Sequence, residues 1–100
     1  MTFMNIGVCK IQLRLPENGT LKDKRQVVRS VTSRTRQKFN VSIAEAASND
    51  DHQLLTLGVS CVSNDARHAN EVLSHVVEYI QSLRLDVELV DYQLEIISGV

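Results

Sequence analysis

The chain has 100 residues, of which 43% are hydrophobic and 23% charged, with a formal net charge of −1. A chain of this length buries roughly 60–65% of its unfolded surface, so we expect residues 1–100 to form a single domain, and the composition excludes extended disorder. No apolar run approaches the roughly 20 residues of a membrane span and no basic leader follows Met1, so we expect a cytoplasmic protein.

Residues 3–15 are predicted to form the first strand. Aliphatic and polar side chains alternate from Lys10 to Leu15, which is the period of a half-buried strand. The turn residues from Pro16 to Gly19 end it.

A helix is predicted from Thr20 to about Phe39, with Asn40 as its C-cap. Thr20 and Asp23 have the spacing of a capping box, in which each side chain bonds the backbone N–H of the other residue. The residues that recur at helical spacing are Leu21, Val28, Val31, Thr35 and Phe39.

Two strands and a second helix follow. Alternation predicts strands at 41–45 and 53–61, separated by a polar turn at 48–51. Asp65 is placed to start a helix that ends near Arg84. Its apolar stripe is Ala69, Val72, Leu73, Val76, Ile80 and Leu83.

Residues 87–97 return to strand alternation, with Val90, Tyr92, Leu94 and Ile96 as the inward set. The resulting order, βαββαβ, predicts an α+β fold of the ferredoxin-like, split βαβ type. We expect a four-stranded antiparallel sheet whose first and third strands are central, with two helices on one face.

Several functions of this fold need residues that the chain lacks. RNA-recognition motifs stack bases on sheet aromatics, whereas the third strand has none and the first has only Phe3. Cys9 and Cys61 stand singly, as buried free thiols do, and His52, His68 and His75 are expected on the surface. We therefore expect no metal, no cofactor and no catalytic site. Glu45 is expected to form a structural ion pair with a basic residue of the first helix.

Charge is segregated along the chain. Between Lys22 and Lys38 stand seven basic residues and one acid, so that stretch carries about +6 and the remainder about −7. At 100° per residue Lys22, Arg25, Arg29 and Arg36 share a sector of roughly 60° beside the core stripe. This basic face is either solvated, or bound to RNA or DNA phosphates, or bound to a small anion or a protein partner.

Two strings resemble a known family. "TLKDKRQVVRSVTSRTRQKFNVSIAE" at 20–45 and "TLGVSCVSNDARHANEVL" at 56–73 are similar to the signature of the YlxP-like family of small bacterial proteins. Thr20 stands where that family has Ser, and Leu54-Leu55 stand where it has a tryptophan. The resemblance implies a ferredoxin-like fold. The family's genes often lie among those for translation initiation and ribosome maturation factors, which implies a ribosome-associated role. Together with the basic face, this favours a non-enzymatic accessory factor that binds ribosomal or other structured RNA, and the alternative is a small regulatory or scaffolding module.

The chain is also predicted to form a homodimer. If Ile11, Leu13 and Leu15 face the helices, Met4, Ile6 and Val8 lie on the open face of the sheet, with Leu54, Gly58 and Ser60 beside them. An exposed apolar strip usually marks a contact surface. The alternative is that residues 97–100 fold over the strip.

Overall fold

The computed structural model describes residues 4–16, 19–48, 50–83 and 86–100. Its elements are β1 (Asn5–Arg14), α1 (Leu21–Lys38), β2 (Ser42–Ala47), β3 (Leu54–Ser63), α2 (Ala66–Leu83) and β4 (Glu88–Ile97). This order confirms the predicted βαββαβ arrangement. The expected strand residue Phe3 and the expected helix end at Arg84 lie outside the described residues.

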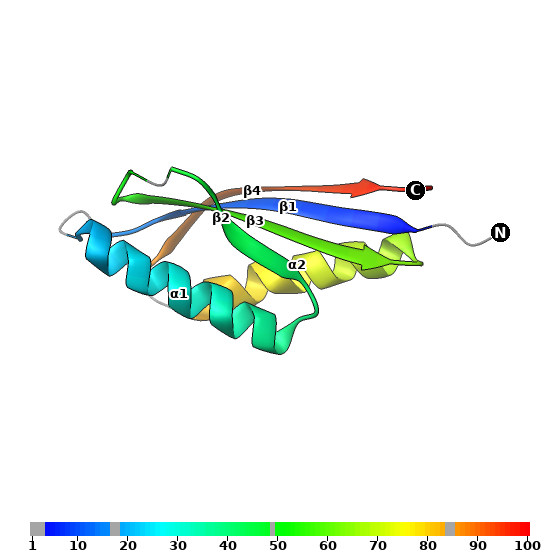
Figure 1. Ribbon diagram of the computed structural model, residues 1–100, viewed down its shortest axis with the longest axis horizontal. Coiled ribbons are helices and arrows are strands. Elements are labelled where there is room, and N and C mark those ends of the chain that lie inside the picture. The colour runs from blue at the N-terminus through cyan, green and yellow to red at the C-terminus, as the bar shows by residue number, and fades with distance from the viewer. Residues whose placement is uncertain (1–3, 17–18, 49, 84–85) are drawn as a thin grey trace.

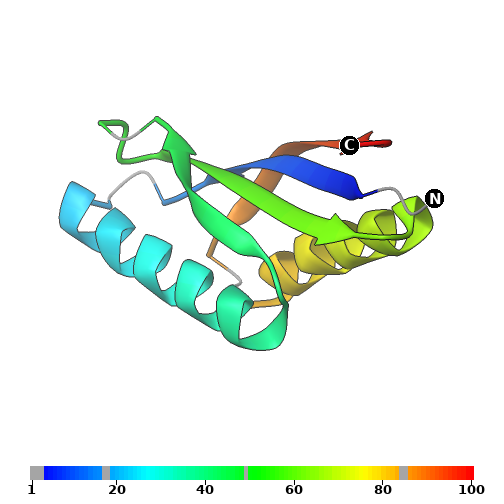
Figure 2. The same ribbon diagram turned by 45° about the vertical axis from the view of Figure 1, so that its right-hand side comes forward.

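The four strands form one antiparallel sheet in the order β2-β3-β1-β4. β1 and β3 are therefore central, as predicted. Both helices lie on the same side of the sheet, and the other side is open (Figures 1 and 2). The fold is the predicted ferredoxin-like α+β arrangement, because each helix connects two parallel strands that have one antiparallel strand between them.

The core lies between the helices and the inner face of the sheet. It takes alternate residues of β1 and β3, among which Ile11, Leu55 and Leu57 are fully buried. α2 supplies most of the helical part, from Ala69 to Ile80. Neither helix of the described ranges is long and apolar enough to cross a membrane.

The inward set of β4 differs from the prediction. The register of β4 against β1 shifts between Gln12 and Leu13, so Leu89 pairs with Leu13. Leu89, Leu94 and Ile96 pack against the core, whereas Val90 is 43% exposed. An extra residue in one strand moves the following side chains to the opposite face, and alternation alone does not reveal it.

The apolar stripe of α1 also differs. Leu21 is 41% exposed, and the helix buries Lys24, Val27, Val31, Thr32 and Thr35. The helix ends at Lys38, and its C-cap is Phe39 rather than Asn40. Phe39 has extended backbone, and its N–H donates to Thr35 O at 2.8 Å.

The predicted capping box is present at the start of α1. The Asp23 N–H donates to Thr20 Oγ1 at 3.1 Å, and the Thr20 N–H donates to Asp23 Oδ2 at 3.0 Å. Replacing Thr20 by alanine removes the acceptor, so we expect Thr20→Ala to lower the free energy of unfolding by about 1 kcal/mol. Thr20→Ser keeps the hydroxyl and should unfold at the wild-type urea concentration. Equal losses in both variants would contradict the role of the cap.

Candidate nucleic-acid interface

The four residues of the basic face all project from α1 and are all exposed. Lys22, Arg25 and Arg29 follow one another at spacings of three and four residues, which places them on one helix face. Their side chains form no ion pair or hydrogen bond with any residue that the structure describes. The helix alone therefore places these three unpaired cations side by side.

Arg36 lies farther along the same helix face. Its Nη2 donates to the carbonyl oxygen of Ile43 in β2 at 2.8 Å. Seven residues of helix separate it from Arg29, which is about 10 Å along the axis. This contact directs the basic face toward the outer edge of β2, and it occupies one end of the Arg36 guanidinium.

A concavity opens between α1 and β2 beside the basic face. Its volume is 410 Å³. It is lined by Leu21, Lys24, Arg25, Val28, Arg29, Glu45 and Asp50. Arg25 and Arg29 therefore border the concavity, whereas Lys22 does not. Glu45 and Asp50 give the same concavity an acidic component, so its charge is mixed.

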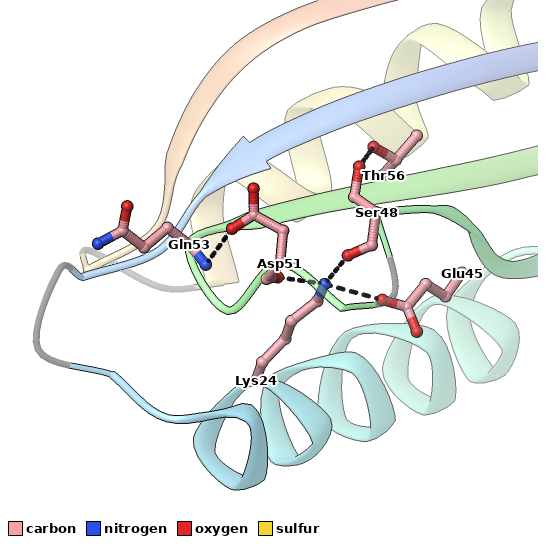
Figure 3. A network of polar contacts seen from close by, with 6 residues as sticks. All are labelled: Lys24, Glu45, Ser48, Asp51, Gln53 and Thr56. Atoms are coloured by element: carbon pink, nitrogen blue, oxygen red, sulfur yellow. Dashed lines mark hydrogen bonds and ion pairs between the residues drawn. The ribbon is translucent and has the colours of Figure 1, made fainter.

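Lys24 lies outside the angular sector of the basic face and is only 2% exposed. Its Nζ lies 3.1 Å from Glu45 Oε2, donates to Asp51 O at 2.6 Å and also donates to Ser48 O. The ammonium group thus forms an ion pair with one carboxylate and donates to two backbone carbonyls (Figure 3).

This Lys24 network ties α1 to the connection between β2 and β3. Figure 3 shows the lysine side chain rising from the first turns of α1 to reach Ser48 and Asp51 in that connection. Ser48 has a left-handed backbone, with φ of 65°, and its hydroxyl lies 3.0 Å from Thr56 Oγ1. The Asp51 carboxylate accepts from the Gln53 N–H at 2.8 Å. The ion pair predicted for Glu45 is confirmed, and Lys24 is its partner.

The remaining candidate groups are apart from this region. His52, His68 and His75 are exposed, and no group of three potential metal ligands occurs among the described residues. Cys9 and Cys61 are buried and free, as predicted. Burial raises the pKa of the Cys9 thiol to about 11 and also raises the pKa of Cys61. Both thiols therefore stay protonated at neutral pH, which makes them poor nucleophiles.

The second sequence string, residues 56–73, contains the N-cap of α2. Asp65 Oδ1 accepts from the Arg67 N–H at 2.9 Å and from the His68 N–H at 3.4 Å, as an N-cap does. The starts of α1 and α2 lie toward opposite ends of a molecule that is 53 Å long (Figures 1 and 2). One chain therefore does not bring Arg25 and Arg67 into a common site.

Comparison with known proteins places the chain in a family. Residues 6–94 match the model of the DUF503 family, which is described as a protein of unknown function. The chain is also 32% identical to the uncharacterized protein YlxP of Bacillus subtilis over 77 residues, covering 77% of this chain and 84% of that protein. The chain belongs to the DUF503 family, and the resemblance seen in the two sequence strings is confirmed.

Proposed function

We propose that this DUF503 protein is a non-enzymatic accessory factor that binds structured RNA, such as ribosomal RNA, through the basic face of α1 in the cytoplasm. The observation that carries the proposal is the exposure of Lys22, Arg25 and Arg29 without partners among the described residues. Cations in this state can neutralise phosphates and release their counterions, which drives nucleic-acid binding. The rest of the chain is acidic, so it confines such binding to this face.

Structured RNA fits the protein better than single strands do. The central strands, Asn5–Arg14 and Leu54–Ser63, contain no aromatic residue, so the open sheet face offers no stacking platform there. Double-stranded and folded RNA present phosphates at fixed positions, which suits a rigid row of cations on a helix. The Lys24 network supports this rigidity, because it fixes α1 against the connection from β2 to β3.

Glu45, which lines the concavity beside the basic face, is paired with Lys24 at 3.1 Å, and its side chain is 25% exposed. This pairing fits a structural role for the carboxylate.

Sedimentation with ribosomal subunits at two salt concentrations tests the proposal. With three phosphate contacts, affinity should fall by roughly 40-fold between 50 and 200 mM salt. Reversing two charges in Arg25→Glu/Arg29→Glu should abolish co-sedimentation at both concentrations and leave thermal stability within about 0.5 kcal/mol of wild type.

A matched control separates this face from general charge effects. Arg34→Glu/Arg67→Glu changes the net charge by the same amount at exposed positions outside the basic face. It should retain most of the association. Equal losses in the two double variants, or no association of the wild-type protein even at 50 mM salt, would refute the proposal.

The concavity between α1 and β2 supports a second candidate, a small regulatory or scaffolding module whose basic face binds a small anion or an acidic protein partner. Arg25 and Arg29 border a space of 410 Å³, although Glu45 and Asp50 line it as well. A bound anion should raise the melting temperature saturably, whereas RNA binding should weaken steeply with salt. Titration with inorganic phosphate at constant ionic strength distinguishes the two.

A further inference from the structure

The outer face of the sheet is not covered by either helix (Figures 1 and 2). Met4, Ile6 and Val8 lie on this face, because the alternate residues Cys9, Ile11 and Leu13 are buried on the other. The register places Val62 and Ile97 on either side of Ile6. We call these five residues the apolar strip: Met4, Ile6, Val8, Val62 and Ile97.

Three residues of the apolar strip are exposed, Met4 at 41%, Ile97 at 44% and Val62 at 66%, and Ile6 and Val8 between them are half-buried. The predicted neighbour Leu54 is not part of it, since Leu54 pairs with Arg14 at the opposite end of β1. Ser60 lies beside Val8, as expected, whereas Gly58 lies beside Lys10. Contiguous exposed apolar side chains of this kind mark contact surfaces.

The chain's own C-terminus does not cover the strip. The Met4 N–H donates to Val100 O at 3.2 Å, and the Val100 N–H donates to Met4 O at 3.0 Å. Residues 98–100 therefore run beside the start of β1 as a continuation of the β4 edge. The alternative in which residues 97–100 fold over the strip is wrong, and Val100 itself is 57% exposed.

A shallow hollow of 710 Å³ adjoins the strip. Its floor on β2 and β3 is made of small residues, Ser42, Ala44, Ala46, Gly58 and Ser60. Its other side, on β1 and β4, carries the larger residues Val8, Lys10, Gln93 and Glu95. The open face thus has a half with small side chains and a half with large ones.

We propose that a second copy of this chain covers the open face, in a two-fold dimer whose sheets pack face to face. A two-fold axis parallel to the strands and between β1 and β3 places β1 over β3 of the second copy and β4 over β2. The large side chains of one copy then meet the small ones of the other, and Ile6 meets Val62 of the second copy. Such a surface complements itself, which a closed two-fold interface requires.

The area and charge of the face also suit a second copy. β1, β3 and β4 have ten residues each and β2 six. At about 3.3 Å per residue and 4.8 Å between strands, two such faces bury roughly 1,100 Å², above the roughly 1,000 Å² of a specific interface. The open face carries two cations, Lys10 and Arg14, and three acids of β4, Glu88, Asp91 and Glu95. Its net charge is therefore only −1, and the repulsion between two copies is weak. Both α1 helices remain outside, which leaves the basic faces free.

Multi-angle light scattering and sedimentation equilibrium on the full chain test this dimer. At about 100 µM the wild-type protein should have twice the chain mass of 11.2 kDa. Val62→Lys should give the monomer, with a dissociation constant raised by about 100-fold or more, because the two-fold axis brings two lysines into an apolar contact. Val62 is 66% exposed in the single chain, so the lysine leaves folding intact, which circular dichroism checks.

Tyr92→Lys is the matched control. Tyr92 is 47% exposed and pairs with Ile11, so it belongs to the helix side of the sheet. This variant should remain a dimer. A wild-type protein that stays at 11.2 kDa, or a dimer that Val62→Lys leaves intact, overturns the proposal. So does a monomer that sediments with phosphatidylcholine vesicles, because the strip would then be a lipid contact.

Discussion

Lys24→Met is expected to lower the free energy of unfolding by about 3 kcal/mol, the low end of the range for breaking a buried ion pair. Methionine fills the volume of the lysine stem, so the loss comes from the polar partners. Glu45 loses its counter-charge, and the carbonyls of Ser48 and Asp51 lose their donor. The Glu45 side chain is 25% exposed, so water still solvates part of the carboxylate and limits the loss. Urea unfolding followed by circular dichroism measures the change.

Lys22→Met provides the comparison. Lys22 is exposed on the same helix and has no partner among the described residues, so its replacement should change the unfolding free energy by less than about 0.5 kcal/mol. Removing both charges in Lys24→Met/Glu45→Leu should recover stability relative to Lys24→Met alone. If Lys24→Met and Lys22→Met unfold at the same urea concentration, the Lys24 network contributes nothing to the fold.

The helical spacing of the residues in α1 is also consistent with a buried Lys24. Lys24, Val27, Val31 and Thr35 recur at helical spacing, and all four are buried. A lysine in such a stripe is ordinarily assigned to the surface because burying its charge is costly. The cost is offset here by Glu45 and two carbonyls of the following connection, which only the tertiary structure brings to the ammonium group. The alternation of residues 41–45 did predict the ion pair of Glu45, but seven basic residues of α1 were possible partners.

The helices and strands were predictable because the spacing of the hydrophobic residues and the helix-capping residues indicated the same elements along most of the chain. Thr20 with Asp23, and Asp65 before α2, mark both helix starts in sequence and in structure. The exception is β4, where one extra residue near Val90 changes which side chains face the helices. The basic face was predictable as an angular sector of α1. Its surroundings were not, since the Arg36 contact with Ile43 and the acids beside Arg25 depend on how β2 packs.

Gly7→Ala is expected to lower the free energy of unfolding by about 2 kcal/mol, within the range for inserting a methyl group into a packed core. Gly7 lies in β1 on the face that α2 covers. A Cβ at this position would lie 2.7 Å from Leu73 Cδ1, 3.2 Å from Cys61 Sγ and 3.4 Å from Ile96 Cδ1. Leu73 is fully buried, so its side chain has little room to move away. The glycine therefore sets the distance at which α2 packs on the sheet.

A double-mutant cycle with Leu73→Val distinguishes this clash from other effects of the substitution. Valine lacks the Cδ1 atom that the new methyl group meets, although Leu73→Val alone should cost about 1 kcal/mol through lost contacts. If the clash dominates, Gly7→Ala/Leu73→Val should be more stable than the sum of the two single losses by about 1 kcal/mol. Additive losses would place the cost of Gly7→Ala elsewhere. A Gly7→Ala protein as stable as wild type would mean that α2 can shift away from β1, because a methyl group cannot occupy that space while Leu73 keeps its place.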